Sequence, residues 1–397
     1  MTTDSALTAT SALARARKVS SLLAEHADAA DTARRLPHTT VDAVNQLKLF
    51  DLLAPKRFGG AELSIETQLM CSAALGEGCV ATAWCHTVWG VHAWLLGHFP
   101  IAAQEAVWSV ARPSGLRPLV SASLIPAGTS VMRESHAQLS GRWEFASGCD
   151  HADWVLLCAP ISTTSNAPSI PHLFLLSPDQ FHIDDTWYVS GLSGTGSKDI
   201  VVSEARIPVE HMVSMQDIAF ARSPGIDAHG GSLLRNPLYG VLAVVLAGAP
   251  LGGARAAIEH FRTRLQSRVL ASGRQQLELA AAHLRLAEAC AEVDAAELLL
   301  RRVCSDLDTL SRCVEPAPLE ARARLTRDTA FAVRACARVV NRIYEASGAH
   351  GLRLSSPLQR IWRDVNAAAT HATLNWDTQG ESYGRIALGL EPSMPRV

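Results

Sequence analysis

The stretch LAAAHLRLAEACAEVDAAELLLRRVCSDLDTL, residues 279–310, decides the fold. Its apolar residues recur at alternating spacings of three and four positions. They are Leu279, Ala282, Leu286, Ala289, Val293, Ala296, Leu300, Val303, Leu307 and Leu310. This spacing gathers the apolar side chains into one stripe, which is typical of a helix packed in a bundle. The segment therefore predicts a single bundle helix of about nine turns.

The rest of the C-terminal part predicts further helices. Pro316 and Pro318 interrupt the chain before an expected helix from Leu319 to Glu345. The pair Ser356-Pro357 is typical of a helix start, with Ser as the N-cap and Pro at the first helical position. An apolar helix is also expected before residue 279, ahead of the segment with the apolar stripe. Together these segments predict a four-helix bundle over residues 216–397.

Residues 118–215 have a different sequence pattern, because short β-prone runs alternate with turn residues. The runs include Leu119–Ile125, Trp154–Cys158, Leu173–Leu176 and Ile200–Val202. They predict a compact, barrel-like β domain. The Gly191–Gly196 loop contains G-x-x-G-x-G, but this is not the dinucleotide fingerprint, and a β-prone run follows it instead of a helix. A Rossmann site is therefore not expected.

Residues 1–117 predict an N-terminal helical domain. Thr39–Asp42 is expected to form a capping box for a helix that continues through Val44 and Phe50. Trp84–Leu96 predicts an apolar helix that is rich in Trp and His. The expected fold is mainly α, with a β domain inserted between two helical parts.

The composition argues against several classes of function. The net charge is −2, so neither nucleic acid nor an anionic membrane is an expected partner. The most apolar window, Val241–Leu251, is too short to span a bilayer, and residues 1–20 lack the core of a signal peptide. The nine cysteines form no C-x-x-C pair, and no histidine cluster has metal-ligand spacing. We expect reduced thiols, no metal and a cytoplasmic protein.

Several ordered motifs carry a family resemblance. They are Ser121–Ser130 (SASLIPAGTS), Phe145–Trp154 (FASGCDHADW), Gly191–Val202 (GLSGTGSKDIVV) and Trp362-Arg363-Asp364 in the last bundle helix. With the domain order, they make residues 20 to 390 resemble the acyl-CoA dehydrogenase fold. The resemblance implies that the β domain holds the ring of a flavin.

Within that fold the chain resembles one branch more than the other. Dehydrogenases commonly carry a catalytic carboxylate in a Tyr-Glu-Gly-Thr segment after the Arg-Asp pair, whereas this chain has Ala368–Asp377 (AATHATLNWD). Val91–Trp94 (VHAW), Ser147–His151 and His371 resemble the two-component aromatic monooxygenases. That resemblance implies an oxygenase component that takes reduced flavin from a separate reductase. With O2 it would form a flavin hydroperoxide that hydroxylates a small aromatic or polycyclic substrate.

The same resemblance assigns the candidate site. His92 and His371 are the expected catalytic histidines, because His titrates near working pH, and Ser147 offers its hydroxyl to the flavin. The expected flavin-binding residues are Ser123, Ser147, Gly148, Cys149, Thr195 and Ser197, with Ser347 and Gly348 from a neighbouring subunit. The expected pocket walls are His86, Trp89, Trp94 and Trp376, together with Trp84. Candidate phosphate ligands are Arg262, Arg264 and Arg268.

Some alternatives stay open on sequence alone. His92 would look the same as a satisfied core histidine, and the tryptophans as ordinary core residues. His371 follows Asp364 by seven residues, which would put both on one face of a helix. Reduced FMN is preferred as the cofactor, with FAD possible, and a homotetramer is expected. A same-fold N-hydroxylase, an acyl-CoA dehydrogenase-like flavin dehydrogenase or a catalytically silent assembly protein are the alternative functions.

Overall fold

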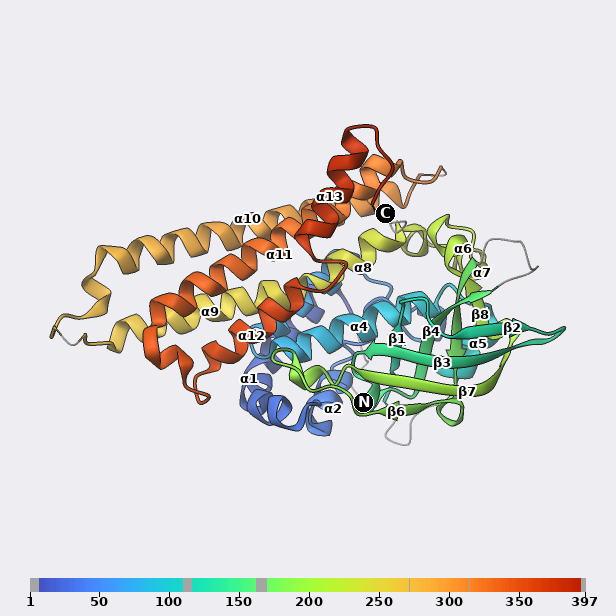
Figure 1. The fold of residues 1–397 in the computed structure, drawn as a ribbon, viewed down its shortest axis with the longest axis horizontal. Helices are drawn as coiled ribbons and strands as arrows, with labels where there is room; N and C mark the ends of the chain where they lie inside the picture. Colours follow the sequence, from blue (N-terminus) through green and yellow to red (C-terminus); the bar gives the residue numbers. More distant parts are fainter. Residues whose placement is uncertain (1–6, 110–115, 162–169, 271, 314, 394–397) are drawn as a thin grey trace.

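The computed structural model describes residues 7–109, 116–161, 170–270, 272–313 and 315–393. A helical bundle forms one end of the molecule and a β domain forms the other, and the N-terminal helices lie along the junction (Figure 1). The N-terminal helices are α1 (Ala9–Ala33), α2 (His38–Gln46), α3 (Ile65–Gly76), α4 (Val80–Leu96) and α5 (Ile101–Trp108). Every residue of α4 is buried, because α4 packs on the bundle helix α9 (Gly248–Ser267) and on the first strand of the β domain.

The predicted capping box at Thr39–Asp42 is wrong. Helix α2 begins at His38, directly after Pro37, and no side chain caps it. Thr40 is buried and its Oγ1 lies 2.8 Å from Nδ1 of His26 on α1. Its hydroxyl thus joins two helices instead of capping one.

The β domain is one sheet of eight strands in the described residues. They are β1 (Val120–Ser123), β2 (Thr129–Met132), β3 (His136–Ala146), β4 (Trp154–Ile161), β5 (Ile170–Leu176), β6 (His182–Asp184), β7 (Lys198–Pro208) and β8 (Met212–Ser214). The order is β6-β7-β3-β2-β4-β5-β8, and β1 pairs with β4 in parallel. Trp143, Phe174 and Ile200 are fully buried in a core of the domain's own. The strands occupy residues 120–214, against the predicted range 118–215.

The C-terminal part contains the predicted bundle. Its helices are α6 (Met215–Ala219), α7 (Pro224–His229), α8 (Leu238–Leu246), α9, α10 (Ala280–Leu310), α11 (Leu319–Ser347), α12 (Pro357–Ala369) and α13 (Trp376–Ala387). The predicted apolar stripe of residues 279–310 is confirmed, because Ala289, Val293 and Leu300 of α10 are buried against α9 and α11. Ser356 is the N-cap residue of α12 and Pro357 its first residue, as expected.

The last predicted helix is shorter than expected. Helix α12 ends at Ala369, and α13 starts after Asn375, whose side chain accepts a hydrogen bond from the backbone of Thr378. His371 therefore lies in the connecting turn, and the prediction that it shares a helical face with Asp364 is wrong.

The stretch Leu238–Ser267, with α8 and α9, is long and apolar enough to cross a membrane, since its mean hydropathy reaches 1.8 in one window. However, 94% of that window is buried inside the protein. Burial of this kind is typical of a core helix.

Candidate active site

Three hydroxyl groups and one indole form a hydrogen-bonded chain at the junction of α4 and the sheet. The indole Nε1 of Trp84, on α4, donates to Oγ of Ser147 over 3.1 Å. Oγ of Ser147 lies 2.7 Å from Oγ of Ser197, which lies 2.6 Å from Oγ1 of Thr195. The motifs Phe145–Trp154 and Gly191–Val202 thus meet here, and the structure brings three of the predicted flavin-binding residues together.

Strand β1 fixes the backbone that carries Ser147. Oγ of Ser121 donates to the carbonyl of Ser147 over 2.8 Å, and Oγ of Ser123 donates to the carbonyl of Glu144 over 2.7 Å. Ser123 was predicted as a flavin-binding residue, and Ser121 was not singled out. Because the hydroxyl hydrogens of both point to backbone carbonyls, their visible role is to hold the end of β3 in place.

Gly148 allows the turn that follows Ser147. Its φ is +70°, and its N–H donates to the carbonyl of Thr195 over 2.8 Å. A Cβ built on Gly148 would lie 2.5 Å from the ring of Trp89, a separation that real Cβ atoms do not show. The glycine therefore serves both the left-handed backbone and the close approach of α4.

Replacing Gly148 by Ala is expected to lower the free energy of unfolding by about 2–4 kcal/mol, because backbone strain adds to overpacking against Trp89. Urea unfolding of the wild type and Gly148→Ala measures this loss. Gly230→Ala is the matched control, because Gly230 also has a positive φ, +68°, but nothing lies within 4 Å of its added Cβ. Equal losses in the two variants would contradict the packing argument.

His92 faces the junction from α4. Its Nδ1 lies 2.9 Å from the carbonyl of Val120, and because a carbonyl only accepts, Nδ1 carries the ring hydrogen. In the neutral ring Nε2 then holds a lone pair, and among the described residues it has no hydrogen-bond partner. Burial lowers the pKa of His92 to about 4, so the ring is neutral near pH 7 and the expectation that it titrates near working pH is wrong for the free protein. His92 thus presents an acceptor.

His371 has the opposite hydrogen-bonding character. The backbone N–H of Thr373 donates to its Nδ1 over 3.3 Å, so Nε2 carries the hydrogen in the neutral ring. Its ring centroid lies 5.4 Å from that of Trp84, edge to face. The side chain is exposed, yet surrounding protein lowers its pKa to about 4 through burial. His371 thus presents a hydrogen-bond donor beside Trp84.

Asp364 supports the Gly191–Gly196 loop and was not predicted as a site residue. Its Oδ1 accepts a hydrogen bond of 2.6 Å from the backbone N–H of Leu192. Leu192 has a φ of +56°, so this bond helps to hold an unfavourable backbone conformation. Burial raises the pKa of Asp364 to about 7. The motif Trp362-Arg363-Asp364 was the available signal for this contact.

The thiol of Cys149 has a packing role. It donates to the carbonyl of Gly196 over 3.4 Å, and burial raises its pKa to about 12. A neutral buried thiol is a weak nucleophile, so the structure gives no sign of reactivity there. Its role in flavin binding stays a prediction.

The structure places three of the predicted pocket residues in the packed core. His86 is fully buried, with Nε2 on the carbonyl of Leu49 and Nδ1 on Oγ of Ser72. Trp94 is also fully buried, and its indole donates to the carbonyl of Leu233. Trp89, on α4, is buried, and its ring lies against Gly148. None of the three contacts Ser147 or His371 through a described hydrogen bond or ring contact.

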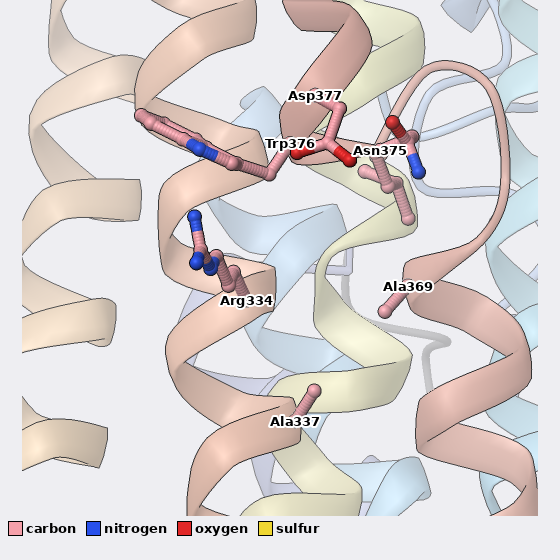
Figure 2. A pocket seen from close by; sticks show the side chains of 7 residues that line it. Arg334, Ala337, Ala369, Asn375, Trp376 and Asp377 are labelled. Carbon is pink, nitrogen blue, oxygen red and sulfur yellow. The ribbon is translucent and has the colours of Figure 1, made fainter. Parts of the chain in front are cut away.

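Trp376 lines a different space. A cavity of about 280 Å³ lies where α11 meets the start of α13, and Figure 2 shows the indole of Trp376 extending above Arg334. The guanidinium carbon of Arg334 lies 5.5 Å from the ring centroid. The lining residues are Arg334, Ala337, Ala369, Leu374, Asn375, Trp376 and Asp377, and they include neither Ser147 nor His371. A substrate role for Trp376 stays a prediction.

Ser347 and Gly348 lie at the far end of the bundle beside a group of cations. Arg268 donates to the carbonyl of Ser347 over 3.1 Å. The pKa of Arg264 is lowered by burial and by the charges of Arg268 and Arg353, and its buried Nε has no partner among the described residues. In the part of the chain that the structure describes, no carboxylate pairs with these three arginines. We call Arg264, Arg268 and Arg353 the arginine cluster.

Comparisons with known proteins show the family to which this chain is similar. Residues 12–109 match the family "Acyl-CoA dehydrogenase, N-terminal domain", and residues 244–376 match "Acyl-CoA dehydrogenase, C-terminal domain". The oxygenase component of the FADH(2)-dependent resorcinol hydroxylase of Rhizobium sp. is 33% identical over 95% of this chain and 94% of that protein. The crystal structure of the HsaA monooxygenase of M. tuberculosis matches with 30% identity and a TM-score of 0.91, over 98% of this chain and 100% of the other.

The chain belongs to the flavin-dependent monooxygenases of the acyl-CoA dehydrogenase fold. The predicted fold and the predicted activity, an oxygenase component that uses reduced flavin, are both confirmed. A further match is XiaF from Streptomyces sp. in complex with FADH2 and glycerol, at 27% identity and a TM-score of 0.89 over 98% of each chain.

The residues of this monooxygenase fit a flat flavin ring at Ser147. Phe145, two residues earlier, has a φ of +66° and keeps 54% of its surface exposed. Its ring lies edge-on to Trp187, with centroids 6.1 Å apart. An exposed aromatic beside a buried hydroxyl chain offers both an apolar face and a polar contact to a ring. Reduced flavin bound there would supply the oxygen-activating chemistry.

Proposed function

We propose that this monooxygenase hydroxylates a small phenolic substrate at the junction of α4 and the β domain. The opposite hydrogen-bonding characters of His92 and His371 carry the proposal. Nε2 of His92 accepts, and Nε2 of His371 donates. The resorcinol hydroxylase relative and the p-hydroxyphenylacetate 3-hydroxylase of Acinetobacter baumannii, 26% identical over 98% of this chain, bear names that specify phenols.

The two histidines would have different roles in the hydroxylation of a phenol. A phenol becomes a better nucleophile at its ring carbons as its proton leaves, and Nε2 of His92, whose lone pair is left free by the bond of Nδ1 to Val120, would accept that proton. His371, beside Trp84, can donate a hydrogen bond to the phenolic oxygen, which develops negative charge as its proton leaves. His92 is buried, and exclusion of water around it suits an oxygen-activating site.

An assay with a flavin reductase, NADH, O2 and a panel of phenols tests this function. The expected result is a hydroxylated product that forms in proportion to O2 consumed, with little H2O2 released. Aromatic amines and an acyl-CoA in the same assay test the N-hydroxylase and dehydrogenase alternatives. Product from either of these, with none from any phenol, would contradict the proposal.

We further propose that the flavin is FAD, although the sequence favoured FMN. FAD carries a diphosphate and an adenosine that FMN lacks, so it needs more cationic contacts. Among the residues that the structure describes, the arginine cluster supplies three cations that no carboxylate pairs with. Arg262, which was also a candidate phosphate ligand, pairs with Glu259 over 2.7 Å instead. The relatives named with FADH(2) support the same choice.

Replacing Arg264 by Gln is expected to weaken binding of reduced FAD about tenfold, the usual scale for loss of one charged hydrogen bond. The effect on reduced FMN should be smaller. Anaerobic titrations of each flavin measure both dissociation constants. Arg262→Gln is the matched control, because it removes an arginine of the same helix whose charge is already paired. Equal weakening of FAD binding in both variants would reject the arginine cluster as a phosphate site.

We also propose that the protein is a homotetramer, and the position of the arginine cluster supports a second subunit at each flavin site. The arginine cluster lies at the ends of α9 and α11. These helix ends are at the end of the bundle away from the β domain (Figure 1), whereas Ser147 bonds Trp84 of α4. One extended flavin would therefore take its ring contacts from one subunit and its phosphate contacts from another. Light scattering of the purified protein should give the mass of four chains, and a monomer that turns over would contradict the proposal.

A further inference from the structure

The hydrogen bonds that link the three hydroxyl groups at the site are all donated in one direction. Its first group, the indole Nε1 of Trp84, can only donate. Its last group, the carbonyl of Leu192, can only accept, and Oγ1 of Thr195 donates to it over 2.7 Å. Each hydroxyl has a single hydrogen, so Thr195 must accept from Ser197, and Ser197 must accept from Ser147. The order of donation is Trp84, Ser147, Ser197, Thr195 and then Leu192.

This direction determines what Ser147 can offer to a ligand. Its hydrogen is committed to Ser197, and one of its two lone pairs accepts from Trp84. One lone pair remains. Ser147 therefore presents an acceptor, so the hydroxyl that the family resemblance assigned to the flavin would contact it through a lone pair.

The three hydroxyl groups are held rigidly enough to keep this direction of hydrogen-bond donation. Ser147, Ser197 and Thr195 keep 8%, 4% and 2% of their surface exposed, so water has little access to compete for their hydrogens. The terminal carbonyl of Leu192 is fixed because it also accepts from the indole Nε1 of Trp187 over 3.1 Å and from the backbone N–H of Thr195 over 3.0 Å. An unmade hydrogen bond in such surroundings costs more than one in water.

We propose that Thr195 and Ser197 are positioning residues that make this site select reduced over oxidised flavin. The inference rests on the proposed function, in which the ring lies against Ser147. Reduction of a flavin places a hydrogen on a central ring nitrogen that carries only a lone pair in the oxidised form. The lone pair of Ser147 attracts that N–H, whereas it faces another lone pair when the flavin is oxidised. Oxidised flavin would then leave after turnover and free the site for reduced flavin.

The variant Thr195→Val tests this directly. Val has nearly the same shape as Thr but removes the acceptor on which Ser197 depends. Ser197 is then free to donate to Ser147, which turns the hydrogen of Ser147 toward the ligand. Oxidised flavin should gain a hydrogen bond and reduced flavin should lose one. The ratio of the dissociation constants, oxidised over reduced, is expected to fall about threefold to tenfold, on the scale of one hydrogen bond.

Two further variants complete the experiment. Thr195→Ser keeps the hydroxyl and should keep the wild-type ratio. Thr329→Val is the matched control, since Thr329 is fully buried in α11 and its hydroxyl donates to the carbonyl of Leu325, away from the site. Fluorescence titration gives the affinity for oxidised flavin, and anaerobic titration gives that for reduced flavin. If Thr195→Val does not fold, Ser197→Ala, which also releases the hydrogen of Ser147, takes its place.

The outcomes separate this inference from the proposed function. A lower ratio in Thr195→Val, with wild-type ratios in Thr195→Ser and Thr329→Val, supports the positioning role. An unchanged ratio in Thr195→Val, or a wild-type protein that binds both redox forms equally, overturns it while phenol hydroxylation stands. A wild-type protein that binds reduced flavin but hydroxylates no phenol overturns the proposed function alone.

Discussion

Replacing His92 by Asn is expected to lower the rate of phenol hydroxylation about 100-fold or more, the usual contribution of a general base. The amide nitrogen of Asn can take the place of Nδ1 and keep the hydrogen bond to the carbonyl of Val120. Nothing replaces the lone pair of Nε2. O2 consumption should continue, with its oxygen released as H2O2 instead of entering the product. The measurements are product by chromatography and H2O2 by a peroxidase assay, per NADH oxidised.

Two comparisons make the His92 prediction specific. His371→Ala removes a donor rather than a base, so product formation should fall by less, about tenfold, with flavin binding nearly intact. His283→Ala removes a histidine on α10 that bonds only the nearby carbonyl of Leu277, and full activity is expected. Wild-type product yield in His92→Asn would remove His92 from the mechanism.

Acid is expected to destabilise this monooxygenase steeply below pH 6.5. Burial lowers the pKa of His86, His92 and His151 to about 4, against 6.5 in the unfolded chain. Between these values the unfolded chain binds protons that the folded protein excludes, so the stability from these groups is present above pH 6.5 and is lost as the pH falls toward 4. Each histidine lowers the free energy of unfolding by about 1.4 kcal/mol per pH unit in that window.

The variant His86→Gln isolates one of these contributions. The amide of Gln can donate to the carbonyl of Leu49 as Nε2 does, but it does not titrate. Urea unfolding at fixed protein concentration should show a slope of stability against pH between 6 and 4.5 that is shallower by about 1.4 kcal/mol per unit than in the wild type. His283→Gln, on the exposed face of α10, should leave the slope as it is. Parallel curves for the wild type and His86→Gln would contradict burial as the cause.

Local patterns predicted the elements whose neighbours in sequence determine them. The seam from Leu279 to Leu310 predicted α10, because period and burial repeat every few residues. Ser356-Pro357 predicted the start of α12 for the same local reason. Strand β3 was not among the predicted runs, because two register shifts, one of them at Gly141, interrupt the alternation of its buried Ala137, Leu139 and Trp143.

The turn after α12 shows where local reasoning failed. No Gly or Pro marks a break near Ala369, so the sequence predicted a continuous helix through His371. The break depends on Asn375, which caps α13, and on packing of α13 against α11. Tertiary contacts thus decided an end that helix propensity left open.

The sequence by itself determined the domain order, the bundle, the family and the identities of His92, Ser147 and His371 as candidates. Only the tertiary structure decided what those residues can do. The lone pair of His92 is set by Val120, and the remaining lone pair of Ser147 is set by Trp84 and Ser197, which lie 63 and 50 residues away in the chain. A hydroxyl or an imidazole can donate or accept, and the choice belongs to its partners. Those partners come together only when α4 packs on the β domain.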